Sequence, residues 1–199
     1  MTFAEYSDFH QQLLTIAADQ QQPPYTSALY LDYTRMNFQR SRRWLKTLEL
    51  EPKLLELLQR IQEPQHWLLI TEPWCGDAAH SVPVIQRIAE VQPLIRLEIQ
   101  LRDQEPYTIN KYLTRGGKSI PKLIMRSETG KDQAVWGPRP LECQLLYDQL
   151  TAAEADFETI KMQLQHWYNT DKGRSIQEEL LGLLKKFVQP AEVAELPDC

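Results

Sequence analysis

The order of strand and helix patterns in the middle of the chain restricts its fold more than any other feature. An apolar run over residues 66–71 predicts a buried strand, a stripe over 82–88 predicts a helix, and alternating polarity over 95–101 predicts a second strand. Residues 120–125 and 133–136 predict two strands joined by a hairpin. A strand, helix, strand crossover gives parallel pairing, whereas a hairpin gives antiparallel pairing. We therefore expect an α/β fold with a mixed sheet and helices on both faces.

Additional helices are expected before the sheet region. Apolar residues at helical spacing predict helices over residues 3–16 and 38–48, and a third that begins near Pro52 and runs to Ile61. The glutamines and prolines at 20–24 separate the first two, since consecutive prolines cannot lie inside a helix. These helices should cover one edge of the sheet or one side of a binding groove.

The chain after the second strand is also expected to be largely helical. Residues 104–113 predict a short helix that glycines 116 and 117 terminate, and a long helical region is expected from about 141 to 168. Gly173 should break it. A final helix over 175–188 and a frayed end at 190–199 complete the prediction.

Charge and cysteine content indicate the environment of the protein. The 22 Lys and Arg against 27 Asp and Glu give a net charge of −5, which argues against nucleic acid or an anionic membrane as a partner. No stretch has the apolar length of a membrane span, and residues 1–22 lack the pattern of a signal peptide. Cys75, Cys143 and Cys199 are too widely spaced for a disulfide framework or a zinc cluster. We expect a cytoplasmic protein without a bound metal.

The sequence Trp74-Cys75-Gly76-Asp77-Ala78 is the strongest local motif, because it joins a predicted buried strand to the start of a helix. Unpaired N–H groups and the positive end of the helix dipole favour the thiolate of a cysteine placed there. Asp77 opposes this effect with a like charge. We expect the balance to favour a reactive Cys75.

These residues resemble the thioredoxin superfamily. The Trp-Cys-Gly stem, Pro83 in the following helix, and Ile120-Pro121 at the start of a later strand all fit the family pattern, over about residues 65–147. The runs Trp-Cys-Gly-Asp-Ala-Ala, Gly-Gly-Lys-Ser-Ile-Pro-Lys and Trp-Gly-Pro-Arg-Pro are similar to a bacterial branch with extra N-terminal helices. The implied organisation is a helical extension over 1–64 packed on the core, a thioredoxin-like domain over 65–170, and a C-terminal helix and tail over 171–199.

The resemblance also implies how the site is built. It implies a cis peptide bond between Ile120 and Pro121 that faces Cys75. Because proline has no N–H, Pro121 would place no backbone donor beside the thiol. The backbone of Ile120 would pair with an extended partner chain by strand addition, and Trp74 would form one wall of that groove.

Two departures from the family pattern matter for the chemistry. Ala78 stands where a dithiol reductant has the second cysteine that releases its product. Leu69 stands where thioredoxin has a carboxylate that assists proton transfer. Cys143 and Cys199 match no family resolving position. We interpret Cys143 as a buried structural residue and Cys199 as an exposed thiol on the tail.

Other polar side chains have simple interpretations beside the catalytic ones. Asp77 and His80 are one helical turn apart, and a local contact between them is favoured over a triad with Cys75. Lys118, Lys122, Arg115 and Arg139 are candidates for lowering the pKa of Cys75 or holding a carboxylate, although solvated surface charge is the favoured interpretation. Tyr33, Phe38, Trp44 and Trp67 are expected in the core.

The leading functional hypothesis is a single-thiol oxidoreductase. Cys75 would attack a disulfide in a partner, and a low-molecular-weight thiol, as co-substrate rather than bound cofactor, would resolve the adduct. Trp74, Gly76, Ile120 and Pro121 would shape the site, and Asp77 would modulate the proton affinity of the thiol. The alternative is a module that binds extended peptides without turnover, and a thiol peroxidase is the third hypothesis.

Overall fold

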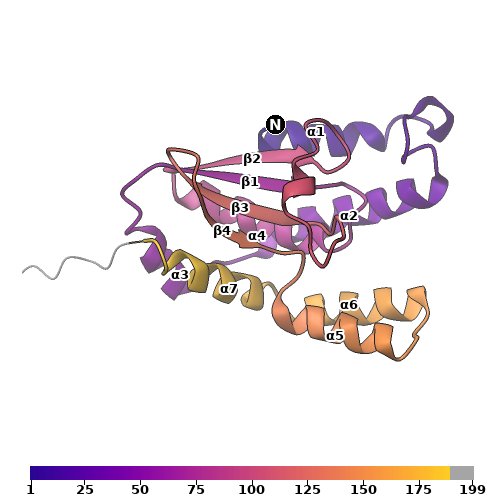
Figure 1. Cartoon of the computed structure of the whole chain (residues 1–199). Coiled ribbons are helices and arrows are strands. Elements are labelled where there is room, and N and C mark those ends of the chain that lie inside the picture. The colour runs from indigo at the N-terminus through magenta and orange to yellow at the C-terminus, as the bar shows by residue number, and fades with distance from the viewer. Residues whose placement is uncertain (189–199) are drawn as a thin grey trace, which may run out of the picture.

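The computed structural model describes residues 1–188, so the expected frayed end and Cys199 lie outside the described residues. Within the described part, seven α-helices surround a four-stranded sheet (Figure 1). None of the described helices is both long and apolar enough to cross a membrane. The expected α/β architecture is confirmed.

The sheet has the predicted mixture of parallel and antiparallel pairs. Its strands are β1 (Gln65–Thr71), β2 (Ile95–Leu101), β3 (Lys122–Ser127) and β4 (Asp132–Trp136), in the spatial order β2-β1-β3-β4. β1 is parallel to β2 and antiparallel to β3, and β3 pairs antiparallel with β4. β1 is therefore an interior strand, which explains its nearly uninterrupted apolar sequence.

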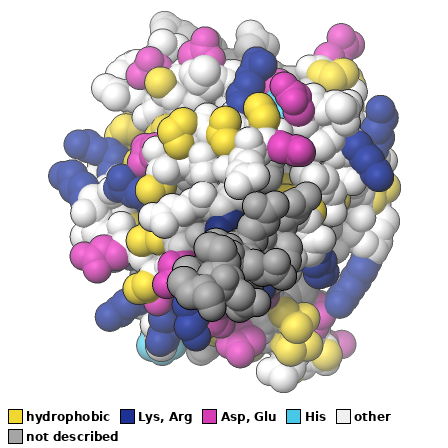
Figure 2. Space-filling view, turned by 90° about the vertical axis from the view of Figure 1, so that its left-hand side faces the viewer, with side chains coloured by type: hydrophobic (Ala, Val, Ile, Leu, Met, Phe, Trp, Pro, Cys, Tyr) yellow, Lys and Arg dark blue, Asp and Glu magenta, His cyan; other side chains and the backbone are white. Residues whose placement is uncertain are grey.

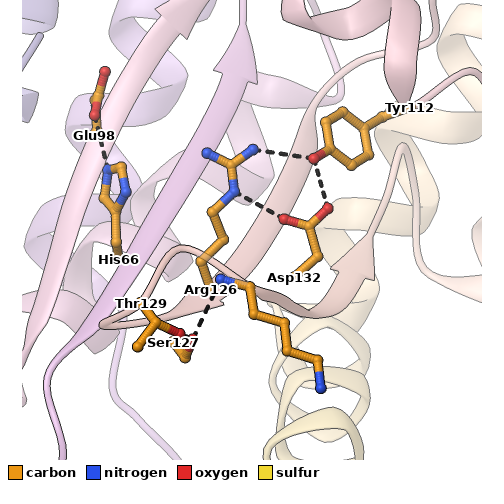
Figure 3. Close-up of polar contacts among 8 residues, drawn as sticks. His66, Glu98, Tyr112, Arg126, Ser127, Thr129 and Asp132 are labelled. Carbon is orange, nitrogen blue, oxygen red and sulfur yellow. Dashed lines mark hydrogen bonds and ion pairs between the residues drawn. The ribbon is translucent and has the colours of Figure 1, made fainter.

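One face of the sheet has a polar end. His66 on β1 contacts Glu98 on β2 at 2.8 Å, and Arg126 on β3 binds both Asp132 at 2.9 Å and the Tyr112 hydroxyl at 3.0 Å (Figure 3). The segment between β2 and β3 contacts this face through Tyr112. It forms only a 3₁₀ helix, Thr108–Lys111, instead of the α-helix expected over 104–113. Pro106 and the left-handed backbone of Tyr107 (φ 51°) stand where that α-helix would have to continue.

The helix α4 (Ala78–Val91) makes the crossover between β1 and β2 and brings Val84, Ile85 and Ile88 fully into the core. Two short amphipathic helices, α3 (Pro52–Leu58) and α7 (Arg174–Leu184), pack on each other and add Leu54, Ile176, Leu180 and Leu184 to the same core. At about 25 cal/mol per Å² of apolar surface, such burial is the main source of stability.

The first two helices cover an edge and a side of this core. α1 (Phe3–Leu13) follows Met1, whose ammonium group donates to the Ile99 carbonyl on the edge strand β2 and whose carbonyl accepts from the Ile99 N–H. α2 (Ala28–Thr47) packs along α4 and begins well before the expected residue 38. Leu31 and Thr34 are buried in this earlier part, which extends the apolar face beyond the run seen in the sequence.

The C-terminal helical region consists of two helices rather than one. α5 (Leu141–Ala152) and α6 (Phe157–Asp171) form a hairpin that projects from the body of the molecule (Figure 1). Asp156 caps α6 by accepting a hydrogen bond from the Thr159 N–H. The predicted break at Gly173 is confirmed, because this residue has φ +78° and a Cβ there would lie 3.2 Å from Val84.

The surface of the described residues carries charges of both signs. Figure 2 shows the face at the left of Figure 1, where Lys and Arg side chains lie among Asp and Glu side chains. The visible part of this face is thus a mixed surface rather than one basic patch.

One face of α2 donates side-chain hydrogen bonds to the loop before α4 and to α4 itself. Asn37 Nδ2 donates to the Pro73 carbonyl at 3.1 Å, Ser41 Oγ donates to the Ala79 carbonyl at 3.3 Å, and Trp44 Nε1 donates to His80 Nδ1 at 2.9 Å. These donors recur every three to four residues, so they share one helix face. The N-terminal helices are thereby fixed to the part of the fold that carries Cys75.

We expect Trp44→Phe to lower the free energy of unfolding by about 2 kcal/mol, because it leaves His80 Nδ1 without its donor and opens a small cavity. Urea denaturation measures this effect. Leu29→Ala is the control, since Leu29 lies on the same helix with its side chain 57% exposed, and should change stability by less than about 0.5 kcal/mol. Equal effects of the two substitutions would contradict the described docking of α2.

Candidate active site

The loop between β1 and α4 places Cys75 opposite the start of β3. The Cys75 side chain is 7% exposed, and its Sγ donates to the Ile120 carbonyl at 3.4 Å. The Ile120–Pro121 peptide bond is cis, as the resemblance implies. The Cys75 N–H donates to the Glu72 carbonyl at 3.1 Å, which closes the turn. The structure therefore brings Cys75, Ile120 and Pro121 together.

The other residues of the motif surround this contact. Trp74 is half-buried, with the Tyr30 ring edge-on at 5.5 Å and the Arg102 guanidinium 4.7 Å from its ring centre. Gly76 has open space where a Cβ would stand. Ala78 is only 2% exposed, so the position of the absent second cysteine faces the interior.

Burial and Asp77 control the proton affinity of Cys75. Burial is the larger cause and Asp77 adds to it, and together they raise the pKa of Cys75 to about 12. The backbone N–H groups of Ala78 and Asp77 and the charge of Arg139 lower the pKa, in the direction expected for the start of a helix. These lowering effects are together smaller than the raising ones. The thiol is therefore less acidic than the sequence led us to expect, because the sulfur is buried.

Asp77 forms a buried ion pair that the sequence did not indicate. Arg139 binds its two carboxylate oxygens at 3.0 and 2.8 Å, and the Tyr168 hydroxyl donates to Oδ1 at 2.9 Å. The side chains of Arg139 and Asp77 are 16% and 11% exposed. The interpretation of Arg139 as solvated surface charge is therefore wrong, because Gln144 and the Tyr147 ring also enclose its guanidinium.

His80 is held away from Cys75 chemistry. Its Nδ1 accepts from Trp44, its Nε2 contacts Gln165 Oε1 at 3.3 Å, and its ring stacks on Tyr168 at 4.2 Å. The expected local contact with Asp77 is a backbone one, in which the His80 N–H donates to the Asp77 carbonyl at 3.2 Å. The Asp77 carboxylate itself is bound by Arg139 and Tyr168. Burial, followed by the charge of Arg40, lowers the pKa of His80 to about 3, so it is neutral at pH 7.

The basic residues near Ile120 also make structural contacts. Lys122 is 4% exposed and donates to the Thr114 hydroxyl and the Gly137 carbonyl, so its interpretation as solvated charge is wrong. Arg115 pairs with Asp148 at 2.9 Å at the surface, and Lys118 is exposed. Cys143 is fully buried, as expected. Within residues 1–188, no group of His, Cys, Asp or Glu side chains is placed to hold a metal ion.

Sequence reasoning missed Glu72, a buried carboxyl three residues before Cys75. Its side chain is held by the Tyr25 hydroxyl at 3.2 Å and the Asp103 N–H at 3.1 Å, and the residue is 3% exposed. Burial raises the pKa of Glu72 to about 7. An acidic residue directly after a buried strand was the available signal. Its partners Tyr25 and Asp103 are distant in sequence.

The comparisons with known proteins agree with this geometry. The thioredoxin family matches residues 24–154, so the chain belongs to the thioredoxin family. A Pseudomonas aeruginosa protein of unknown function is similar in structure, with a TM-score of 0.55 and 19% identity over 94% of this chain and 98% of that one. An HIV epitope-scaffold has a TM-score of 0.53 and 20% identity over 94% of this chain and 99% of its own. Both likenesses concern the fold alone, and no curated protein matches the chain.

We expect alkylation of Cys75 to speed up about 100-fold between pH 8 and pH 10, because each pH unit below a pKa changes the thiolate fraction tenfold. A thiol of ordinary pKa, about 8.5, gains only about fourfold over this range. Mass spectrometry of the Cys75 peptide after timed iodoacetamide treatment gives the rate, and circular dichroism checks that the fold persists at pH 10. A rate that levels off below pH 9 would contradict the buried thiol.

The raised pKa of Glu72 predicts a pH dependence of stability. The folded state keeps a proton that the unfolded chain releases at its ordinary pKa of 4.5. The stabilisation is thus complete below pH 4.5 and is lost as pH rises through 7, a loss of about 3 kcal/mol. Glu72→Gln should remove this slope. Urea denaturation of both proteins between pH 5 and pH 8 measures it, and parallel curves would show that Glu72 is ionised in the fold.

Proposed function

We propose that the protein is a thiol–disulfide oxidoreductase that uses a single thiol, Cys75. The observation that supports this most is the position of Cys75 Sγ. It lies just before α4 and 3.4 Å from the Ile120 carbonyl, in a chain of the thioredoxin family. An extended client segment beside Ile120 would lie next to the sulfur, and strand addition gives a physical basis for such docking. Trp74 and Gly76 border the same position.

The reaction has three steps that balance. The Cys75 thiolate attacks one sulfur of a client disulfide, which forms a mixed disulfide and releases the other client sulfur as a thiolate. The thiolate of a low-molecular-weight thiol then attacks the Cys75 sulfur and releases the reduced client. A second such thiol attacks the small-thiol sulfur, which returns Cys75 and leaves the small thiol oxidised as its disulfide.

The external thiol is needed because Ala78 cannot resolve the adduct. The other cysteine of the described residues, Cys143, is fully buried on α5. Widely spaced free thiols suit a reducing compartment, and we assign the protein to the cytoplasm on this basis.

The raised pKa of Cys75 supports a second candidate, a module that binds extended peptides without turnover. At pH 7, few molecules carry the thiolate, which is the nucleophile in disulfide exchange. A thiol of high pKa is also a slow leaving group, so an adduct at Cys75 would persist. Both candidates dock an extended peptide beside Ile120, and they differ only in whether the sulfur reacts.

Incubation with an extended peptide that contains a disulfide distinguishes them. In a Cys199→Ala background, which removes the thiol expected on the tail, we expect one mixed disulfide per chain without added thiol, and catalytic peptide reduction at pH 9 when glutathione is added. Cys75→Ser should abolish both reactions, whereas Cys143→Ala, which removes the buried sulfur, should change the rate by less than about twofold. Liquid chromatography with mass spectrometry follows the peptide.

Reduction that persists in Cys75→Ser would refute the role of Cys75. Peptide binding that is equally strong in the wild type and Cys75→Ser, with no reduction in either, would establish the binding module instead.

A further inference from the structure

Asp77 is the charged residue nearest to Cys75 along the chain, and it is paired with Arg139 from a distant segment. Asp77 lies two residues after the cysteine, and Arg139 lies just before α5. The guanidinium meets both carboxylate oxygens, the strongest geometry for such a pair. Because both side chains are largely buried, solvent screens their charges little.

We infer that Arg139 is a positioning residue that acts through Asp77, and that the intact pair sets how readily Cys75 gives up its proton. This inference rests on the proposed function of Cys75. An intact pair presents to the sulfur a carboxylate whose charge the bound guanidinium offsets in part. Loss of Arg139 would leave an uncompensated carboxylate that disfavours the thiolate, and loss of Asp77 would leave an uncompensated cation that favours it.

Tyr168 completes the arrangement from a third element. Its hydroxyl donates to Asp77 Oδ1, while its ring stacks on His80 with an interplanar angle of 5°. His80 is in turn fixed by the Trp44 indole of α2. The Asp77 carboxylate is therefore held in one orientation by α6 and by the loop before α5. α2 contributes indirectly, because its Trp44 fixes the His80 ring on which Tyr168 stacks.

Other titratable groups surround the sulfur and the pair, and they remain unchanged in the variants below. They are Tyr6 on α1, Glu72 in the same loop, Arg102 after β2, and Cys143 on α5. Tyr6 is buried, and negative charges on Cys75 and Glu72 add to the burial that raises its pKa. Comparison between variants at one pH removes the contributions of these groups.

The test is the alkylation rate of Cys75 at pH 9 with uncharged iodoacetamide in Asp77→Asn, Arg139→Gln and the double variant. We expect Asp77→Asn to react about tenfold faster than the wild type and Arg139→Gln about tenfold slower, since one pKa unit is a factor of ten. The double variant should lie between the wild type and Asp77→Asn, because Asp77 acts on the thiol more strongly than Arg139 does. The difference in ultraviolet thiolate absorbance between each protein and its Cys75→Ser counterpart, followed with pH, gives the same order independently of reagent access.

A merely structural role predicts a different pattern. If the pair only holds the loop in place, both single substitutions loosen it, and both rates change in the same direction. That result, or rates within twofold of the wild type for both, would overturn the inference. Arg139→Lys keeps the positive charge but not the contact with both oxygens, so its rate should lie between those of Arg139→Gln and the wild type and within about threefold of the wild type.

If Arg139→Gln does not fold, Asp77→Asn and Arg139→Lys still decide the question. Faster alkylation in Asp77→Asn with a near-normal rate in Arg139→Lys supports the inference, and any other combination refutes it. Alkylation needs no client or resolving thiol. A protein that fails to reduce disulfides but shows the opposed shifts would therefore disprove the proposed function while leaving the electrostatic role of the pair established.

Discussion

The pairing of β1 with a neighbour on each side is the constraint on which the site depends. β1 is hydrogen-bonded in parallel to β2 and in antiparallel to β3, with Ile70 opposite Lys122. Because β3 runs the other way, the residues before Lys122 lie beyond the end of β1, next to the loop that follows it. Ile120 and Pro121 are thus delivered to Cys75 by register, and a shift of one residue would turn these side chains to the opposite face.

Around this fixed point, the chain buries an unusual set of polar groups. Glu72, Asp77, His80 and Lys122 are all largely withdrawn from solvent, on the segments that lead into and out of the Cys75–Ile120 contact, and each has hydrogen-bond partners. Burial of charge is costly unless partners compensate it, so such groups are expected where a fold positions chemistry rather than where it only stabilises itself. The Thr71 hydroxyl and the Trp74 indole N–H are buried nearby without a partner among the described residues. The surroundings of the sulfur therefore combine polar groups with burial.

Local patterns allowed much of the fold to be predicted. The alternation of Ile95–Leu101 gave the bounds of β2, and the motif around Cys75 indicated the strand, the turn and the helix start. Local signals were misleading where a segment is held by distant contacts. Residues 104–113 have helical spacing but follow a path set by Pro106 and by packing on the sheet, and one long helix was expected where Asp156 starts a second.

The electrostatics of the site were not accessible from local patterns, because the decisive partners are far apart along the chain. Arg139 is 62 residues from Asp77, and Tyr168 is 91 residues away. Nothing in the run Trp-Gly-Pro-Arg-Pro shows which carboxylate its arginine meets. The raised pKa of Cys75 has the same origin, since burial is a property of the assembled fold.

The projecting α5–α6 hairpin is anchored to the site at both of its ends. Arg139 precedes the first helix of this hairpin and Tyr168 lies near the end of the second, so both ends of the hairpin bind the Asp77 carboxylate. An outward movement of the hairpin would break the contacts of Arg139 and Tyr168 with Asp77. Displacement of the hairpin would therefore remove both donors from Asp77, which links the position of these two helices to the charge two residues after Cys75.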